Sequence, residues 1–264
     1  MNTSWPSVAK VVAIAMIALL PIQASGESSC RASSGPATRP LVELYTSEGC
    51  DSCPPADRWL SATLADAASP ANALAFHVDY WDRLGWKDRF ASAEFTERQR
   101  RAADANRAGF VYTPQVLLQG HDFSWRAADV ATALRESGIQ PARATIELSA
   151  DSASSGTHVR AVARVPDNAL RKDAQLWLAY VDNGLVSDVK AGENRGVRLH
   201  HDRVVRALAG GTRADAQGAI TVDTTLPVPA ERGRSPAIVA FVQRSGSFDV
   251  LQSLALPLTD CPTR

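Results

Sequence analysis

The chain contains 264 residues, which at roughly 150 residues per domain predicts one or two domains. Its 28 basic residues balance its 28 acidic residues, and 45% of its positions are hydrophobic, so the composition excludes disorder, collagen and coiled coil. Because the net charge is near zero, we expect neither nucleic acid nor an anionic membrane surface as a partner.

The first 26 residues predict a secretory signal peptide. Lys10 precedes the apolar run VVAIAMIALLPI, and no acidic residue occurs before Glu27. The run is about half as long as the ~20 residues that span a bilayer, so a permanent membrane anchor is the less favoured alternative. With cleavage after Ala24 or Gly26, we expect a periplasmic or secreted protein that has no membrane span and lies in an oxidising compartment.

Four cysteines form one close pair and one distant pair. Cys50 and Cys53 are separated by two residues, whereas Cys30 and Cys261 lie near the two ends of the mature chain. Of the three possible connectivities, the economical one joins Cys50 to Cys53 and Cys30 to Cys261. The second bond would be structural and worth about 5 kcal/mol by the chain-entropy model. Unpaired or intermolecular thiols are the alternative.

Residues 40 to 138 alternate between strand and helix patterns. The close cysteine pair stands between a predicted strand and a helix that begins with Pro54 and Pro55, residues favoured in a first helical turn. Cys50 is therefore expected at or just before a helix N-terminus. The predicted strands cover residues 40–47, 73–81 and 113–120, a short polar hairpin and a fourth strand follow, and the predicted helices cover 54–68, 95–106 and 127–138.

This order of elements, with Cys-x-x-Cys at the first helix and Thr-Pro opening the third strand, resembles the thioredoxin fold. The segments VELYTSEGCDSCPPADRWL, AFHVDYWDRLGWKDRFAS, FTERQR and VYTPQVLLQG resemble, more narrowly, an uncharacterised family of exported bacterial thioredoxin-like proteins known as a domain of unknown function. The likeness extends to GENRG and VVRAL beyond residue 190. It implies an α/β thioredoxin-like fold and leaves the substrate open.

The resemblance also implies roles for the residues around the pair. Cys50 would attack, because the helix N-terminus favours an anion, and Cys53 would resolve the mixed disulfide. Pro114 matches the cis-proline that aligns a bound peptide, and Thr113 would offer its backbone to the substrate. Glu43 matches the buried acid that helps to deprotonate the resolving thiol, although a strand-edge carboxylate facing water is the alternative.

The segment that follows the second predicted strand is rich in aromatic and acidic side chains. Tyr80 and Trp81 lie at the carboxyl end of that strand, where ligands of open α/β sheets gather, so they form a candidate substrate-binding lip. Equally, large side chains there could cover the edge of the core. Glu48 and Asp51 place negative charge beside a thiolate and are expected to shift the pair toward a reducing potential.

His77 offers the alternative of metal chemistry. With two thiolates it could form a three-ligand site for copper or zinc, as in a copper metallochaperone, but a packed core histidine is the simpler interpretation. No nucleotide-binding glycine loop, Ser-His-Asp order or paired metal motif occurs, so we expect no cofactor and no metal.

After residue 140 the pattern changes to short alternating runs without helices, which predicts a β-sandwich. The expected organisation is a signal peptide at 1–26, a thioredoxin-like domain at 27–140 and an all-β, sandwich-like domain at 141–264. Basic residues gather in GENRGVRLHHDRVVRALAGG, where they could bind an anion or form a solvated face.

Two functions follow from these features. The leading prediction is an exported thiol-disulfide oxidoreductase that acts on protein or peptide thiols and exchanges electrons with an unknown redox partner. The alternative is an envelope binding or assembly protein in which the cysteines are merely structural.

Overall fold

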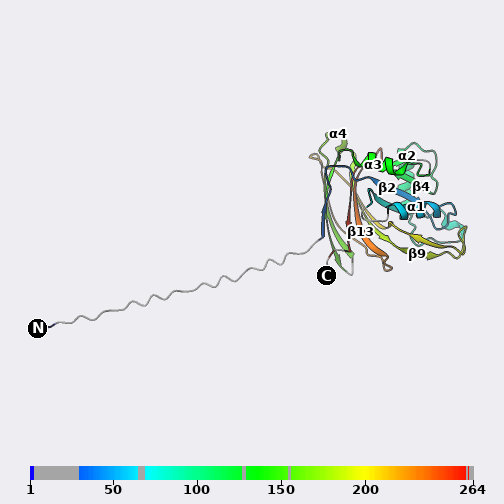
Figure 1. The fold of residues 1–264 in the computed structure, drawn as a ribbon. Helices are drawn as coiled ribbons and strands as arrows, with labels where there is room; N and C mark the ends of the chain where they lie inside the picture. Colours follow the sequence, from blue (N-terminus) through cyan, green and yellow to red (C-terminus); the bar gives the residue numbers. More distant parts are fainter. Residues whose placement is uncertain (3–29, 65–68, 127–128, 154–155, 260, 262–264) are drawn as a thin grey trace.

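Strands from both halves of the chain join in one eight-stranded sheet. The computed structural model describes residues 1–2, 30–64, 69–126, 129–153, 156–259 and 261 (Figure 1). The order of the large sheet is β14-β13-β8-β11-β3-β2-β4-β5. Its strands are β2 (Leu41–Thr46), β3 (Asn72–His77), β4 (Gln115–Leu118), β5 (His121–Asp122), β8 (Ala174–Asn183), β11 (Val204–Arg213), β13 (Arg234–Arg244) and β14 (Val250–Pro257).

Three helices cover the part of this sheet that contains β2 and β4 (Figure 1). On one face, α1 (Pro54–Leu64) and α3 (Val130–Gly138) bury apolar side chains against Val42, Leu44 and Val116. On the opposite face, α2 (Ala93–Ala105) packs against Tyr45 and Phe76. Because successive residues of a strand point to opposite faces, β2 contributes to both cores and is buried along its whole length.

A second sheet packs against the other end of the large one. Its order is β1-β6-β7-β12, with strands β1 (Cys30–Ser33), β6 (Thr145–Ala153), β7 (Gly156–Arg164) and β12 (Ala219–Leu226). Alternate residues such as Ile146, Leu148 and Val159 point inward and meet side chains of β8 and β13. The short helix α4 (Asn168–Arg171) connects β7 to β8. This half of the structure is a two-layer sandwich.

A two-stranded arm leaves the large sheet after β8. It consists of β9 (Leu185–Asp188) and β10 (Arg198–His201), paired antiparallel. In Figure 1 the arm lies beneath α1. The arm therefore brings residues from the second half of the chain to the helix that follows the close cysteine pair.

The two halves are joined by the pairing of β11 with β3. The strands are parallel, with Val204 opposite Ala75, and the amide of Ala75 donates to the carbonyl of Arg203 at 2.8 Å. β11 also pairs antiparallel with β8 over most of its length. Through this junction the sheet continues from the helix-covered part into the sandwich.

The expected fold class is wrong. We expected an α/β thioredoxin-like domain followed by a separate all-β domain, whereas the described residues are mostly β, with 43% strand and 18% helix among them, and one large sheet contains strands from both segments. Residue 140 therefore does not separate two sheets. The local elements between residues 40 and 138 agree with the sequence patterns, and the alternating runs beyond residue 140 are strands. Those strands do not form a separate domain as predicted, because β11 pairs with the edge of β3 and so extends the first sheet.

A buried ion pair ties α2 to the large sheet. The Arg98 guanidinium donates from Nε and from its terminal nitrogen to the two carboxylate oxygens of Glu43, at 2.9 and 3.0 Å. The same terminal nitrogen donates to Gln243 on β13, and the Tyr45 hydroxyl donates to Glu43. Both charged side chains are only 1% exposed. Four aromatic rings surround the guanidinium: Phe76, Trp177, Phe241 and Phe248.

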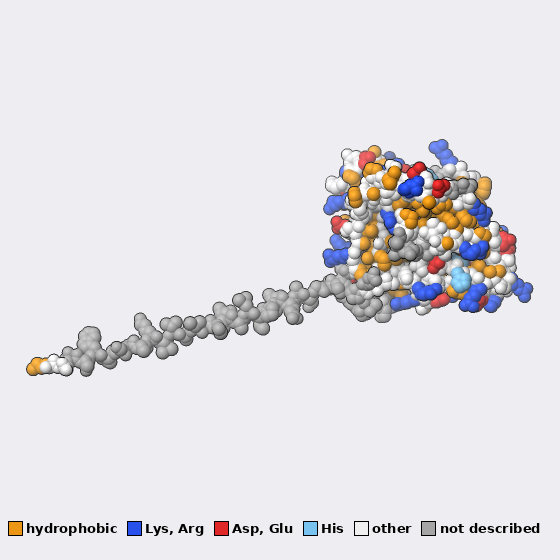
Figure 2. Space-filling model, viewed as in Figure 1, with side chains coloured by type: hydrophobic (Ala, Val, Ile, Leu, Met, Phe, Trp, Pro, Cys, Tyr) orange, Lys and Arg blue, Asp and Glu red, His pale blue; other side chains and the backbone are white. Residues whose placement is uncertain are grey.

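The distant cysteines form a disulfide. Cys30 of β1 is bonded to Cys261, which follows β14, with their Cα atoms 5.3 Å apart. Both ends of this bond belong to the sandwich, since β1 pairs with β6. The predicted signal peptide lies almost entirely outside the described residues. Within the part that is described, no helix is long and apolar enough to cross a membrane. On the face shown in Figure 2, basic and acidic side chains are scattered among hydrophobic ones.

Candidate functional site

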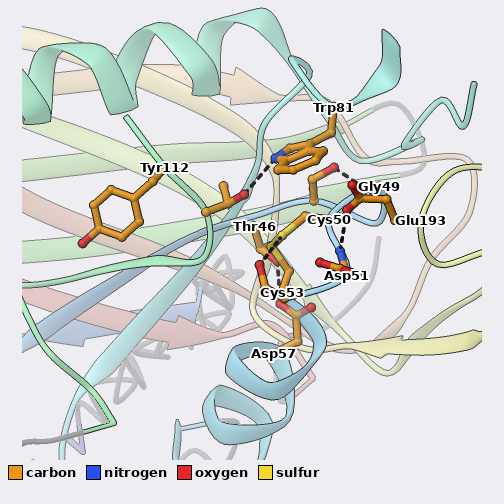
Figure 3. Close-up of a disulfide and its surroundings, with 12 residues drawn as sticks. Thr46, Gly49, Cys50, Asp51, Cys53, Asp57, Trp81, Tyr112 and Glu193 are labelled. Carbon is orange, nitrogen blue, oxygen red and sulfur yellow. Dashed lines mark hydrogen bonds between the residues drawn. A yellow bond between two sulfur atoms is a disulfide. The ribbon is translucent and has the colours of Figure 1, made fainter. Parts of the chain in front are cut away.

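The close cysteine pair begins α1. Cys50 and Cys53 form a disulfide with a Cα separation of 5.4 Å, directly after β2 and its short loop (Figure 3). The carbonyl of Cys53 accepts the amides of Ala56 and Asp57, so the pair stands at the helix N-terminus. Both cysteines are 0% exposed. An external thiol therefore cannot reach either sulfur in this conformation.

Trp81 covers one side of the pair. It lies in the loop that follows β3, and its indole N–H donates to the Thr113 hydroxyl at 2.8 Å (Figure 3). A Cβ at position 49 would come within 3.0 Å of the Trp81 Cβ. Glycine at position 49 therefore lets Trp81 lie against the chain just before Cys50.

The tip of the β9–β10 arm covers another side. The Asn194 side-chain amide donates to the carbonyls of Glu48 and Cys50, both at 2.9 Å. The Glu193 carboxylate accepts the backbone amide of Asp51 at 3.2 Å (Figure 3). Asn194 is itself only 5% exposed. The segment that carries Cys50 is thus held by residues more than 140 positions away in sequence.

A cluster of five ionisable side chains is buried next to this site. The cluster comprises Glu48, Asp57, His77, Asp88 and His201, none more than 7% exposed. Its members come from the loop before α1, from α1 itself, from β3, from the loop before α2 and from β10. Asp57 stands one helical turn after Cys53, so both side chains lie on the same face of α1.

Hydrogen bonds and ion pairs connect the cluster. His77 Nδ1 lies 2.7 Å from the Asp88 carboxylate, and His201 Nε2 lies 3.3 Å from Glu48 Oε1. The two imidazole rings are edge to face, with centroids 4.9 Å apart. Asp57 accepts the Thr46 hydroxyl at 2.9 Å, as drawn in Figure 3. Trp86 donates its indole N–H to Glu48 at 2.7 Å.

The environment shifts the pKa values of four members. Burial lowers the pKa of His77, but the carboxylates of Asp88, Asp57 and Glu48 together outweigh burial and raise it. Burial raises the pKa of Asp88, but His77 together with the backbone amides of Glu48 and Phe90 outweighs burial and lowers that pKa below its usual range. The pKa of Glu48 is also lowered, since His201 and the Trp86 hydrogen bond overcome burial. Burial raises the pKa of Asp57, which the facing histidines only partly oppose.

Several buried polar atoms of this cluster have no hydrogen-bond partner among the described residues. They are Glu48 Oε1, His77 Nε2 and both ring nitrogens of His201; Ser187 Oγ on β9 is a further one. Glu48 Oε1 and His201 Nε2 still face each other as an ion pair, whereas His77 Nε2 and His201 Nδ1 have lost their bonds to water without replacement, which is costly in a folded protein. Their concentration beside the close disulfide marks this region as the candidate functional site.

Glu43 does not join this site. It lies on the face of β2 that also carries Leu41 and Tyr45, where it pairs with Arg98. Thr46, which contacts Asp57, lies on the opposite face. The structure therefore does not bring Glu43 together with Cys53, and the predicted relay from Glu43 has no geometric support. Among the buried acids of the cluster, Asp57 is the one on α1, one turn after Cys53.

The predicted substrate-binding residues are only partly brought together. The Thr113–Pro114 peptide is cis, and Thr113 contacts Trp81, which lies over the pair. Tyr80 turns instead toward α2, where its hydroxyl donates to Gln99.

The basic residues of the arm and β11 do not converge on an anion site. Arg198 lies 3.8 Å from Asp188, Arg206 lies 3.8 Å from Asp182, and the Arg203 Nε donates to a backbone carbonyl of α1. His201 is buried while its neighbour His200 is exposed, as strand alternation requires. Within the described ranges, no group of three His, Cys, Asp or Glu side chains could hold a metal ion.

Sequence patterns did not identify Asp57, Asp88, His201 or Asn194 as members of one site. One local signal existed: Asp57 follows Cys53 by four residues, which places it on the same helix face. For the others no local signal existed, because the arm that delivers His201 and Asn194 is placed only by tertiary structure.

Comparisons with known proteins address the family. The family described as protein of unknown function (DUF1223) matches residues 41–243. The chain belongs to this family. The DUF1223 match confirms the domain-of-unknown-function part of the predicted resemblance and leaves its thioredoxin part without support. No curated protein matches the chain.

Two solved structures resemble this DUF1223 protein. A crystal structure of an Agrobacterium tumefaciens protein is 27% identical, with a TM-score of 0.61, and the match covers 88% of this chain and 99% of the other. HBP35 of Porphyromonas gingivalis is 14% identical, with a TM-score of 0.65, covering 87% of this chain and 78% of the other. The second likeness concerns the fold alone.

Proposed function

We propose that the protein exchanges disulfides with exported protein or peptide thiols through Cys50 and Cys53. The observation that carries this proposal is the buried cluster of five ionisable side chains next to the pair. Ionisable groups with shifted pKa values beside a reactive residue type are characteristic of functional sites.

A structural crosslink alone would not require such surroundings. A disulfide between residues three positions apart closes a very short loop, which removes little entropy from the unfolded chain. Burial of ionised side chains, in contrast, carries a desolvation penalty of several kcal/mol per ion before pairing compensates it. Because buried ion pairs can often be replaced by apolar side chains without loss of stability, a chain that needed only a crosslink would not need ionisable groups at these positions.

The proposed exchange proceeds in two displacements. A client thiolate attacks the Cys50 sulfur, the Cys50–Cys53 bond breaks, and its electron pair remains on Cys53, which takes up a proton. A second client thiolate then attacks the client sulfur bound to Cys50, forming the client disulfide and releasing Cys50 as a thiolate. Two client thiols are oxidised and the pair is reduced. A disulfide-bearing redox partner would reoxidise it, and the reverse sequence would reduce clients.

Two groups of the chain support these steps. The N-terminus of α1 favours the thiolate form of Cys50. Asp57, whose pKa is raised by burial and which stands one turn after Cys53, is the candidate proton donor to the Cys53 thiolate. The predicted signal peptide would place this chemistry in the periplasm or outside the cell, where disulfides persist.

A second candidate function is supported by a different observation. Both cysteines of the pair are 0% exposed and already bonded, which is the state expected of structural cysteines. In this alternative the protein binds an envelope partner, and the disulfide fixes the loop between β2 and α1. The alternative predicts that replacing Cys50 by Ser alters stability without removing the binding activity.

The reduction potential of the pair separates the two candidates. We would equilibrate the mature protein in dithiothreitol or glutathione buffers and quantify each disulfide by alkylation and mass spectrometry, with Cys30–Cys261 as the internal reference. A reversible potential of the close pair between roughly −270 and −180 mV supports exchange. A pair that stays oxidised below about −300 mV contradicts it and favours structural cysteines.

Trapping in the native compartment gives the second test. A Cys53→Ala variant should accumulate mixed disulfides through Cys50, and Cys50→Ser/Cys53→Ala should accumulate none. If both variants fold and neither forms mixed disulfides, client exchange is refuted.

A further inference from the structure

The tip of the β9–β10 arm is a short loop between two glycines. Gly192 and Gly196 have φ values of +73° and +83°, a region that favours glycine. The loop is closed by backbone hydrogen bonds from Gly196 to Val189 and from Val189 to Val197. The tip is therefore a defined unit, residues 192–196, attached to the arm through two residues of unusual conformational freedom.

The side-chain amide of Asn194 is directed entirely at the cysteine segment. Both of its hydrogen bonds, to Glu48 and Cys50, go to carbonyls on the chain that carries the attacking cysteine. Glu193 adds one bond, from the amide of Asp51. The neighbouring Arg195 and Gly196 are exposed. These three hydrogen bonds of the tip thus all end within three residues of Cys50, while Gly192 lies close to Trp86 and Leu84.

The base of the arm is anchored separately. His201 and Leu199 are buried, and His201 faces Glu48 inside the ionisable cluster. His201 pairs with Leu185 at the end of the β9–β10 ladder far from the tip, and the Arg198–Asp188 pair lies at the end next to the tip. The tip can consequently leave the cysteine segment while the base of the arm stays in place.

We propose that residues 192–196 form a latch over the Cys50–Cys53 disulfide, and that Asn194 determines how readily an external thiol reaches it. Neither Cys50 nor Cys53 is exposed when the latch is closed, so the disulfide reacts only from an open conformation. Opening breaks the two hydrogen bonds of Asn194 and the bond that Glu193 accepts. The population of the open conformation then sets the rate of exchange.

The size of the effect follows from the two hydrogen bonds of Asn194. At the usual net worth of an intramolecular hydrogen bond, losing both should raise the open population roughly tenfold or more. Asn194→Asp keeps the size of the side chain, removes both N–H donors and places a carboxylate against the two carbonyl oxygens, so it should open the latch at least as far as Asn194→Ala without leaving a cavity. Asn168→Ala is the matched control, because Asn168 is exposed and lies at the start of α4.

The test compares the two disulfides of the same molecule. Purified oxidised protein is treated with dithiothreitol at fixed pH, and the reduction rate of each disulfide is followed by alkylation and mass spectrometry. In Asn194→Ala and Asn194→Asp we expect the close pair to be reduced about tenfold faster or more, with Cys30–Cys261 unchanged. Asn168→Ala should match the wild type for both bonds.

Two results would overturn the latch. One is a change of less than twofold at the close pair in both Asn194 variants while their melting temperatures stay near that of the wild type. The other is equal acceleration of both disulfides, which indicates global unfolding rather than local opening. If Asn194→Ala does not fold, Asn194→Asp and Glu193→Gln decide, with the exposed Glu147→Gln as the control for loss of one carboxylate charge.

As a control on client access the latch rests on the proposed exchange function, but its test uses a small reductant and no client. If no clients are trapped but the Asn194 variants still speed reduction of the close pair alone, exchange is refuted and the latch is supported. Successful trapping without any Asn194 effect would refute the latch alone.

Discussion

Replacement of the buried Arg98 by Met should destabilise the protein far more than the same replacement of an exposed arginine would. The guanidinium makes two hydrogen bonds to Glu43, and both side chains are only 1% exposed. Arg98→Met leaves the Glu43 charge buried and uncompensated, with only the Tyr45 hydroxyl still bonded to it. Removing one partner of a buried pair typically costs about 3–5 kcal/mol, and we expect a loss in that range.

The double variant Glu43→Gln/Arg98→Met should recover at least half of that loss. It removes both charges, and the apolar Met side chain meets the aromatic rings that now surround the guanidinium. The assay is urea unfolding of the oxidised protein, with the free energy taken from the midpoint and slope. A loss below about 1 kcal/mol in the single variant, or equal losses in the single and double variants, would show that the pair is not buried as described.

The same double variant tests whether Glu43 participates in redox chemistry. Glu43 lies on the face of β2 opposite Thr46 and Asp57, so the reduction potential of Cys50–Cys53 should not change. A shift of more than about 30 mV, which corresponds to 1.4 kcal/mol, would contradict this placement.

Two further predictions concern stability. The raised pKa of His77 means that its charged form stabilises the fold; this contribution is complete below the unfolded pKa of about 6.5 and is lost as pH rises through the raised value. The free energy of unfolding should therefore fall over that range in the wild type and fall less in His77→Gln, and parallel pH profiles would refute the His77–Asp88 pairing. Replacing Cys30 and Cys261 together by Ala should cost about 2–5 kcal/mol in urea unfolding, and no change would show that this disulfide contributes nothing.

Local patterns predicted the surroundings of the close disulfide well. The strand before Cys50, the helix that begins at Pro54 and the third strand after Thr113 all occur, since each depends on neighbours within a few residues. The two disulfide pairings in the structure are those expected from spacing. These features are local, or follow from counting cysteines.

The side of β2 that Glu43 faces could not be predicted. All six residues of β2 are buried, so the strand shows no polar face to distinguish its two sides. Alternation places Glu43 with Tyr45 and separates it from Thr46, but only the positions of α1 and α2 decide which face meets the cysteines.

The prediction of two separate domains was wrong for a related reason. The alternating runs beyond residue 140 correctly indicated strands, but alternation says nothing about partners. The pairing of Val204 with Ala75 joins residues about half the chain apart, and no local signal specifies it. His201 and Asn194 reach the site through the same long-range arrangement.

The pairing of β11 with β3 also constrains the order in which the chain can fold as it is synthesised. Until residue 204 has emerged, β3 has an unpaired edge of backbone N–H and C=O groups, although β2, β4 and the first three helices are already present. An N-terminal fragment that ends near residue 140 should therefore aggregate or recruit a chaperone rather than fold on its own. Synthesis of the second half thus completes the first, and the edge of β3 stays open until β11 is available to pair with it.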